Sequence, residues 1–168
     1  MSVFATDDGF SILSDERMEM MMGQRKADHK GNCMEDNGKR ILQFWEKGFK
    51  DCVYVAGVIE VKGTKMIQNP RPAIHHFFVW DKKNDRIIST SNGKHSIHTR
   101  ESYITANPWI CYAEMTWDDL QKLKKMNPTA TDLECVMGWG SKFGKAMVEP
   151  AIKWCKKNGF DSNYLKSK

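Results

Sequence analysis

The sequence contains no run of apolar residues near the ~18 that a membrane-spanning helix requires. Its five cysteines are an odd number and include no CxxC pair, which favours reduced thiols over a disulfide framework. A P-loop, a GxGxxG fingerprint after a strand and a GxSxG elbow are also missing, which argues against the common nucleotide-binding and serine-hydrolase motifs. The first residues are acidic before they are apolar, unlike a secretory signal. We therefore expect a cytoplasmic protein with no membrane partner.

The size and composition are those of one globular domain. A chain of 168 residues buries roughly 70% of the surface that it exposes when unfolded, so it needs no metal or disulfide to fold. Its 40% apolar and 28% charged residues are typical of globular proteins. No repeat or linker divides it, so we predict a single domain over residues 1–168. Within it we distinguish an N-terminal segment (1–30), a core that carries the chemistry (31–115) and a helical part (116–168).

The net charge of +5 is concentrated toward the C-terminus. Residues 121–168 contain ten Lys, no Arg and four acidic residues, whereas the first 120 residues are nearly neutral. A solvated helix face explains such lysines, and Arg, the better residue for bidentate phosphate binding, is absent. The alternative is that residues 121–168 contact an anionic partner. For a nucleic acid this predicts binding that weakens steeply with salt.

The expected elements follow an α+β order of one helix, antiparallel strands and further helices. A helix is predicted from Asn32 to Gly48, because Asn32 is a good N-cap, Glu35 completes a capping box and Gly48 ends the apolar spacing. The other predicted elements are a short helix at 15–24, strands at 52–61, 74–80, 86–90 and 109–115, a helix from Thr116 to Lys125, a helix at 142–157 kinked or split by Pro150, and loops at 63–72 and 91–102.

Cys33 differs from the other four cysteines in its surroundings. Those four lie among apolar residues and are expected in the core; they are Cys52, Cys111, Cys135 and Cys155. Cys33 instead lies in the polar segment GNCMED at a predicted helix start, where unpaired N–H groups and the helix dipole favour the thiolate. Its backbone N–H is also placed to bind an oxyanion. We interpret Cys33 as a candidate nucleophile, with a structural thiol as the alternative.

A nucleophilic thiol needs a base, and two histidines open the second predicted strand. Alternation along the strand puts His76 on the face of Phe78 and His75 on the opposite face. A two-residue or four-residue hairpin loop brings Ser89 of the next strand onto the His76 face, whereas a three-residue loop brings Asn92 into reach. Either side chain is a candidate to orient the imidazole, and the Asn92 amide oxygen is the better acceptor.

These segments resemble the transglutaminase-like and papain-like cysteine superfamily. The resemblance rests on GNCMEDNGKRI, HHFFVWDKKNDRIISTSNG and ESYI within residues 31–104, and small bacterial and phage members with a GNC helix are particularly similar. Members place Cys at a helix start, His at the opening of a later strand, and Asp or Asn on the next strand. Here His76 follows Cys33 by 43 residues, and Ser89 and Asn92 follow His76 by 13 and 16. Ser89 stands where the relatives carry Asp, so Asn92 as orienter, a dyad and an inactive site are all alternatives.

The resemblance implies a papain-like or transglutaminase-like α+β fold, in which the Cys-bearing helix packs on an antiparallel sheet followed by C-terminal helices. It also implies attack of the Cys33 thiolate on an amide or ester carbonyl, with His76 as base and then acid. Water as acceptor gives a peptidase, amidase or deamidase, and an amine gives an acyltransferase; the substrate is a protein, a peptide or another amide. The alternative is a non-catalytic binding module of the same fold that uses its Lys-rich C-terminal surface.

A zinc site is a weaker interpretation. His95 and His98, together with His29 or Cys111, are suitable ligand types, but their spacing matches no strong zinc pattern. We therefore expect neither a metal nor a cofactor.

Overall fold

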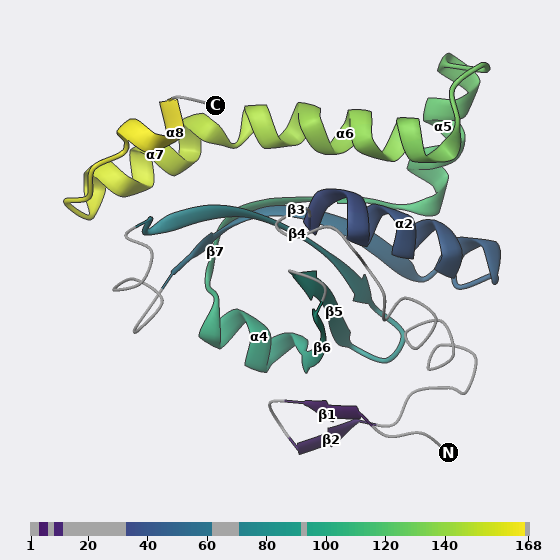
Figure 1. Cartoon of the computed structure of the whole chain (residues 1–168), viewed down its shortest axis with the longest axis horizontal. Coiled ribbons are helices and arrows are strands. Elements are labelled where there is room, and N and C mark those ends of the chain that lie inside the picture. Colours follow the sequence, from purple (N-terminus) through teal and green to yellow (C-terminus); the bar gives the residue numbers. More distant parts are fainter. Residues whose placement is uncertain (1–3, 7–8, 12–32, 62–70, 92–93, 167–168) are drawn as a thin grey trace.

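The computed structural model describes residues 4–6, 9–11, 33–61, 71–91 and 94–166 (Figure 1). They form an α+β structure, as predicted. The strands are β1 (Phe4–Thr6), β2 (Gly9–Ser11), β3 (Cys52–Glu60), β4 (Ala73–Asp81), β5 (Arg86–Ser91), β6 (Lys94–Thr99) and β7 (Trp109–Met115), and the helices are α2 (Cys33–Glu46), α4 (Arg100–Ala106), α5 (Trp117–Met126), α6 (Asp132–Ala146), α7 (Val148–Lys157) and α8 (Asn163–Lys166). The predicted helix at 15–24, the N-cap Asn32 and Asn92 lie outside the described residues.

Five strands form one antiparallel sheet in the order β6-β5-β4-β3-β7, and β1 and β2 form a separate two-stranded sheet. β3 lies between β4 and β7 and pairs with β4 from Cys52↔Asp81 to Glu60↔Ala73. Its sequence CVYVAGVIE is almost wholly buried, as a continuous apolar run predicts for a strand covered on both faces. The predicted strands at 52–61, 74–80, 86–90 and 109–115 correspond to β3, β4, β5 and β7.

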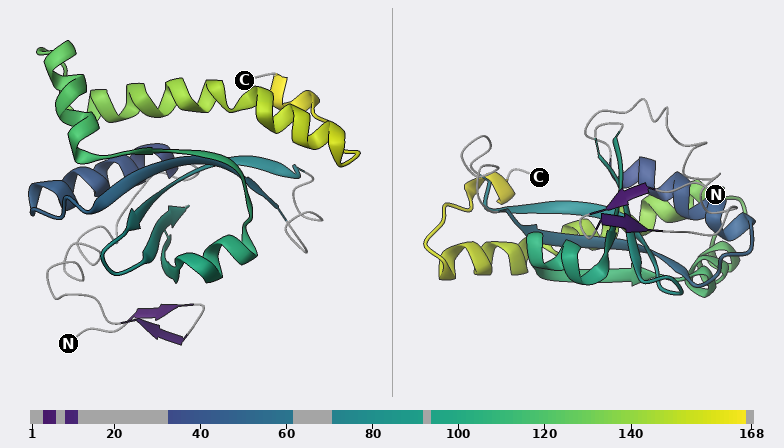
Figure 2. Two further views of the ribbon diagram at one scale, coloured as in Figure 1. Left: turned by 180° about the vertical axis from the view of Figure 1, so that it is seen from behind. Right: turned by 90° about the horizontal axis from the view of Figure 1, so that it is seen from below.

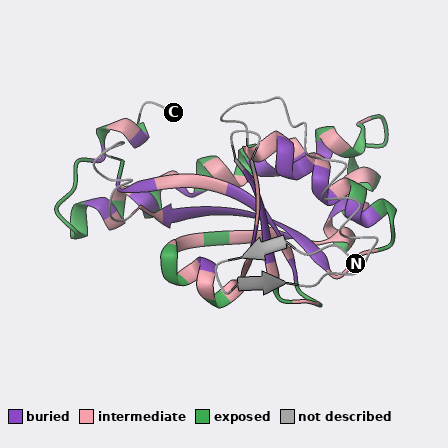
Figure 3. Cartoon of the chain, turned by 60° about the horizontal axis from the view of Figure 1, so that its bottom comes forward, coloured by how far each residue is buried: buried purple, intermediate pink, exposed green. Residues whose placement is uncertain are grey.

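Helices cover the two faces of the sheet unequally. α2, α6 and α7 lie along one face, which we call the first face, whereas α4 lies on the opposite, second face next to β5 and β6 (Figures 1 and 2). The strands are mostly buried between these layers, and α4 and the C-terminal helices expose their outer sides (Figure 3). The sheet therefore has two cores, and a side chain on β4 or β5 belongs to one or the other according to its place in the alternation.

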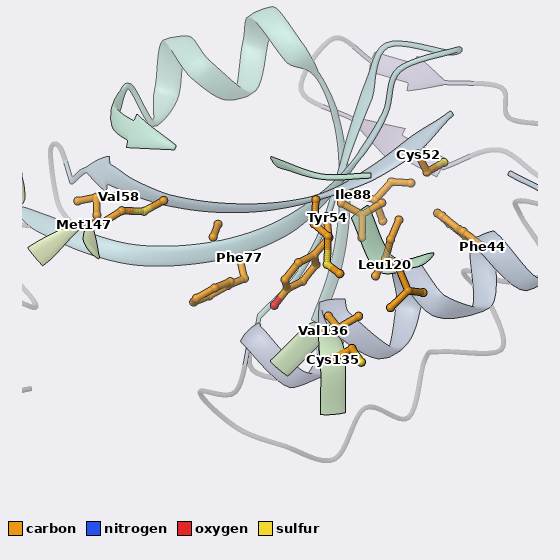
Figure 4. Close-up of a cluster of buried hydrophobic side chains, with 14 of the residues drawn as sticks. Phe44, Cys52, Tyr54, Val58, Phe77, Ile88, Leu120, Cys135, Val136 and Met147 are labelled. Atoms are coloured by element: carbon orange, nitrogen blue, oxygen red, sulfur yellow. The ribbon is translucent and has the colours of Figure 1, made fainter. Parts of the chain in front are cut away.

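The first-face core is the larger one. It joins side chains of the sheet to α2 and the C-terminal helices, and Tyr54 lies inside it near Phe77 and Val136 (Figure 4). The second-face core is a small aromatic and aliphatic cluster of Val53, Val55, Phe78, Ile87 and Tyr103. Tyr103 comes from α4, so this short helix completes the second core.

Side-chain caps begin two of the C-terminal helices. Thr116 and Asp119 form a capping box at the start of α5, as predicted. A second box, formed by Thr131 and Glu134, begins α6 well before the predicted start at 142. The break between α6 and α7 falls ahead of Pro150, which lies in the first turn of α7, where its missing N–H has no intrahelical partner to lose. The helix is therefore split, one of the two outcomes predicted, but the split lies at Met147 rather than at Pro150.

The prediction of a loop over 91–102 is also wrong. Residues 94–99 form β6, which pairs with β5 from Arg86↔Thr99 to Ser91↔Lys94. Thr99 then caps α4, its hydroxyl accepting from the N–H of Ser102. β6 is polar because it is an edge strand, where polar and charged side chains are favoured, and Ile97 is its single apolar residue.

Three of the four cysteines expected in the core are buried, and Cys111 is not. Cys52, Cys135 and Cys155 are buried, Cys33 and Cys111 are partly buried, and all five are free thiols. In the part of the chain that the structure describes, no helix combines the length and the apolar character needed to cross a bilayer.

Candidate active site

The candidate site lies where β4 and β5 stop pairing. Their ladder runs from Asp81↔Arg86 to Val79↔Ile88, closed by a turn at 82–85. Continuing this register would place Phe77 opposite Thr90. At this point the start of α2 is inserted between the strands, and its side chains take up hydrogen bonds of both strand backbones.

Asn37 makes most of these hydrogen bonds. Its Nδ2 lies 2.7 Å from the carbonyl oxygen of Cys33, 2.9 Å from that of Phe77 and 3.1 Å from that of Thr90. Its Oδ1 accepts from the Thr90 N–H at 3.1 Å. The side chain is fully buried, so the amide satisfies backbone groups that would otherwise be desolvated without partners. Asn37 thus ties α2, β4 and β5 together one helical turn from Cys33.

Cys33 is the first residue of α2, and its sulfur lies against β4. The backbone N–H of Phe77 hydrogen-bonds the sulfur, as do the N–H groups of Cys33 itself and Met34. Burial raises the pKa of the Cys33 thiol, and it outweighs these three donors, which lower the pKa; the Asp36 carboxylate raises it further. The lowered pKa expected from the helix start is therefore wrong, because the sulfur is withdrawn from water.

The sulfur of Cys33 is close to tyrosines of both cores. Burial is the main cause that raises the pKa of Tyr54 and of Tyr103, and a charge on the Cys33 sulfur raises both further. Tyr54 belongs to the first-face core, and its hydroxyl donates to the carbonyl oxygen of Met34 at 2.8 Å. Tyr103 belongs to the second-face core. The opening between β4 and β5 therefore allows a thiol on a first-face helix to reach groups on the second face.

His76 lies on the second face and His75 on the first, as the alternation predicts. The Nε2 atom of His75 is 2.8 Å from a carbonyl oxygen of α6. The Nε2 atom of His76 is 3.1 Å from Oγ of Ser89. The hairpin has the four-residue turn, which is one of the two registers predicted to bring Ser89 to His76. Asn92 lies outside the described residues, so its role as orienter stays a prediction.

A buried polar cluster lies on the other side of Thr90. Nη2 of Arg40 is 2.7 Å from Nδ1 of His95, and Oγ1 of Thr90 is 3.0 Å from the same nitrogen. Because a guanidinium can only donate, Nδ1 is an acceptor and His95 is a neutral imidazole with its hydrogen on Nε2. Burial lowers the pKa of Arg40 to about 10, against the Asp36 charge, which raises it, so Arg40 remains a cation at neutral pH.

Asn37, Arg40 and Tyr103 were not identified from the sequence. Asn37 and Arg40 follow Cys33 by four and seven residues and therefore share its face of α2. Polar residues in phase with the buried positions of a helix are a signal that could have identified them. Tyr103 gives no such signal, because its place depends on α4 folding across the second face.

One group among the described residues offers three metal-ligand atoms close together. These atoms of Asp51, Cys52 and Asp81 lie within 4.8 Å of one another. Both carboxylates accept hydrogen bonds from the β4–β5 turn. The Lys83 N–H donates to Asp51 at 3.3 Å, and the Asn84 amide donates to Asp81 at 2.9 Å. These hydrogen bonds account for the cluster without a cation.

The alternative zinc ligands are not brought together by the described residues. His95 and His98 are three residues apart on β6, so their side chains point to opposite faces. The His98 ring packs on Tyr103 in the second-face core, with ring centroids 5.2 Å apart. Cys111 lies on the edge strand β7, and His29 is outside the described residues.

Comparisons of this chain with models of protein families, with curated proteins and with solved structures found no match. The geometry of Cys33, His76 and Ser89 is therefore the basis for assigning a function.

Proposed function

We propose that this protein is a thiol-dependent hydrolase or acyltransferase that acts on amide bonds through Cys33 and His76. The observation that carries the proposal is the hydrogen bond from the Phe77 N–H to the Cys33 sulfur, because Phe77 directly follows His76 in β4. Ser89 engages the His76 ring through Nε2 at 3.1 Å. A Cys at a helix start and a His on a later strand are what the resemblance to transglutaminase-like and papain-like proteins implies, and Ser89 stands where those proteins carry Asp.

The proposed reaction is acyl transfer by general-base catalysis. Nδ1 of His76 takes the thiol proton while the Cys33 sulfur attacks the carbonyl carbon, since Nε2 is engaged with Ser89. A C–S bond forms, the carbonyl electron pair moves to oxygen, and N–H groups at the start of α2 stabilise the oxyanion. The oxyanion then collapses, the C–N bond breaks, and the imidazolium gives its proton to the leaving amine. Water or a second amine attacks the resulting thioester with His76 again as base, and the thiol is released.

The resting nucleophile in this proposal is a neutral thiol, because burial raises the pKa of the Cys33 thiol. The proton therefore moves during the attack on the substrate, which makes the base function of His76 essential to the rate.

A generic ester tests this proposal without knowledge of the substrate. We expect p-nitrophenyl acetate to acetylate Cys33 ahead of the other four thiols, with release of nitrophenolate, and mass spectrometry of peptides locates the acetyl group. His76→Ala should slow acetylation by about a hundredfold or more, the size of a general-base contribution.

His75→Ala is the matched control, because His75 precedes His76 in β4 but lies on the opposite face. It should leave the acetylation rate of Cys33 within a few-fold of the unaltered chain. Equal rates in His76→Ala and His75→Ala would remove His76 as the base, and acetylation of another cysteine in preference to Cys33 would remove the nucleophile.

The second proposal is a non-catalytic binding module with an anionic partner at residues 121–168. It is favoured by the exposure of lysines along the C-terminal helices, namely Lys122, Lys125, Lys142, Lys145, Lys153, Lys156, Lys157 and Lys166. Of the described lysines in this region, Lys124 pairs with Asp132 at 3.1 Å and Lys153 with Glu149 at 3.6 Å. This proposal predicts that a fluorescent oligonucleotide binds and that the affinity falls steeply with salt. Affinity that is independent of salt would contradict it.

A further inference from the structure

An open pocket lies between α5 and α6, two helices that meet at one end of the C-terminal layer (Figure 1). Its volume is about 280 Å³. Apolar side chains form much of its lining, namely Leu123 from α5, Ala130 from the connection, and Cys135 and Trp139 from α6. None of these residues was part of the Cys33 site, so the pocket is a separate feature of the molecule.

A glycine of α6 keeps this pocket open. Gly138 lines it, and a Cβ at this position would meet nothing within 4 Å. Glycine inside a helix costs about 1 kcal/mol relative to alanine, and no close packing requires it here. A larger side chain would favour the helix but would project into the pocket.

The pocket suits one side chain of a larger partner better than an enclosed small molecule. Its volume is below the roughly 300–1,000 Å³ of sites that enclose small ligands, whereas the central apolar residues of protein interfaces fill small pockets of this kind. The apolar surface also extends past the pocket, because Met126, which precedes the lining residue Asn127, is 76% exposed. Exposed apolar surface around a pocket is typical of an interaction site.

The charges at the rim favour an acidic partner. Lys142 lines the pocket one turn beyond Gly138, is exposed, and makes no ion pair with the residues that the structure describes. Glu134, one turn before Gly138, belongs to the capping box of α6, where it accepts from the Thr131 N–H at 3.0 Å. Residues 121–168 contain ten Lys and four acidic residues, so the surroundings of the pocket attract anions.

An acidic protein segment matches these features better than a nucleic acid does. Phosphates would meet Lys142, but the carboxylate of Glu134 at the same rim repels them, and residues 121–168 contain no Arg to bind them with two hydrogen bonds. A protein segment supplies both a carboxylate for Lys142 and a large apolar side chain for the walls at Leu123 and Trp139.

We propose that the pocket between α5 and α6 docks an acidic protein segment, which inserts one large apolar side chain over Gly138 and pairs a carboxylate with Lys142. This inference rests on the second proposed function, a binding module with an anionic partner, and names the chemistry of that partner. It does not involve the reaction at Cys33.

Two labelled peptides test the docking on the full chain by fluorescence anisotropy. One is a fluorescein-labelled heptapeptide of Glu residues with Phe at its centre, and the other has Ser in place of Phe. We expect the Phe peptide to bind at least tenfold more tightly, because only its ring fills the pocket. Equal affinities, or no binding of either peptide, would overturn the inference.

Substitutions on α6 then locate the binding. Gly138→Leu fills the pocket and should reduce the affinity for the Phe peptide to that for the Ser peptide. Ser141→Leu is the matched control, because Ser141 is exposed on the same helix but does not line the pocket, and it should change the affinity less than twofold. Lys142→Met, which keeps the stem without the charge, should weaken binding about tenfold, whereas Lys145→Met should change it only a few-fold.

The fluorescent oligonucleotide separates this inference from the second proposal. Gly138→Leu should change its affinity less than twofold, since lysines outside the pocket attract it. An equal loss for oligonucleotide and Phe peptide would assign the pocket to nucleic acid and overturn the inference. Salt-dependent binding of the oligonucleotide without binding of the Phe peptide would also overturn it, while the second proposal would stand.

Discussion

Asn37 shows how one side chain can hold the candidate site together. Its amide lies where the β4–β5 ladder would otherwise continue, and it hydrogen-bonds the backbone of Cys33, Phe77 and Thr90. Asn37 therefore fixes the start of α2, which carries Cys33, against β4, which carries His76. Its contribution is to stability and to geometry, with no chemical step of its own.

Replacing Asn37 by Ala should destabilise the protein by about 3 kcal/mol, because buried N–H and C=O groups of β4 and β5 lose their partner. Urea unfolding measures this change. The control is Asn127→Ala, which removes one exposed bond at 3.1 Å to the Leu123 carbonyl and should cost less than ~1 kcal/mol. Equal losses in the two variants would show that the Asn37 bonds do not join the strands.

Ser89→Asp tests whether a negative charge beside His76 changes the ionisation of Cys33. Burial raises the pKa of Cys33 above its ordinary value of 9.0, so alkylation by iodoacetamide should reach half its maximal rate above pH 9 in the unaltered chain. Asp36, Tyr54 and Tyr103 also interact with the sulfur electrostatically, and none of them carries a positive charge that would stabilise the thiolate. A carboxylate at position 89 stabilises an imidazolium at His76, and the imidazolium in turn stabilises the thiolate.

The alkylation profile of Ser89→Asp should therefore move to lower pH, read from the rate at Cys33 by mass spectrometry. Ser89→Asn has the same shape without the charge, so its profile should stay close to that of the unaltered chain. A profile that shifts equally in both variants would mean that size rather than charge controls the thiol.

The residues proposed to react could be selected from the sequence, whereas the residues packed around them could not. Cys33 and His76 carry local signals, a polar helix start and a strand opening, and the hairpin register limits the partner of His76 to few residues. The contact of Tyr103 with Ser89 joins α4 to β5 and depends on how the second face is covered. The local sequence ESYI gives no sign that this helix covers the second face next to β5.

At the scale of elements, boundaries marked by caps and turns were predictable and polar edge elements were not. The Thr116 box and Gly48, whose φ is +91°, mark the start of α5 and the end of the first helix region. β6 was not predicted because this edge strand has a single apolar residue, which is too few to show an alternation of apolar and polar side chains. The break after α6 was misplaced because Pro150 is tolerated in a first turn.

Two glycines of α6 test the packing of this helix on the sheet. A Cβ at Gly138 would meet nothing within 4 Å, so Gly138→Ala should stabilise the protein by about 1 kcal/mol through helix propensity. A Cβ at Gly140 would lie 3.2 Å from Sδ of Met34 and 3.4 Å from Cε1 of Phe77. Gly140→Ala should therefore lose that gain to crowding and end near zero or up to ~1 kcal/mol less stable.

Thermal or urea unfolding compares the two variants within one helix. Because Met34 follows Cys33, Gly140→Ala should also change the alkylation rate of Cys33, whereas Gly138→Ala should not. Equal stabilisation by both substitutions would show that α6 does not lie against the start of α2.

At the scale of the whole molecule, the two cores meet at the opening between β4 and β5. The side chains at this junction include a thiol and two phenols that burial keeps protonated. Burial raises the pKa of Cys33, Tyr54 and Tyr103. In each case the folded chain holds its proton to higher pH than the unfolded chain. The stability that these groups contribute is therefore complete below about pH 9 and is lost as the pH rises.

The free energy of unfolding in urea should consequently fall by at least about 3 kcal/mol between pH 8 and pH 11, because Tyr54 and Tyr103 each lose about 1.4 kcal/mol over the pH unit above their unfolded pKa and Cys33 adds to this loss. Tyr54→Phe loses the bond to Met34 and is less stable at pH 8, but its free energy of unfolding should fall less steeply with pH, because one buried acid is gone. Tyr112→Phe, on an exposed ring, should retain the full slope. A stability that is level up to pH 11, or an equal slope in both variants, would mean that the hydroxyl of Tyr54 reaches water, and the two cores would then not close around the opening between β4 and β5.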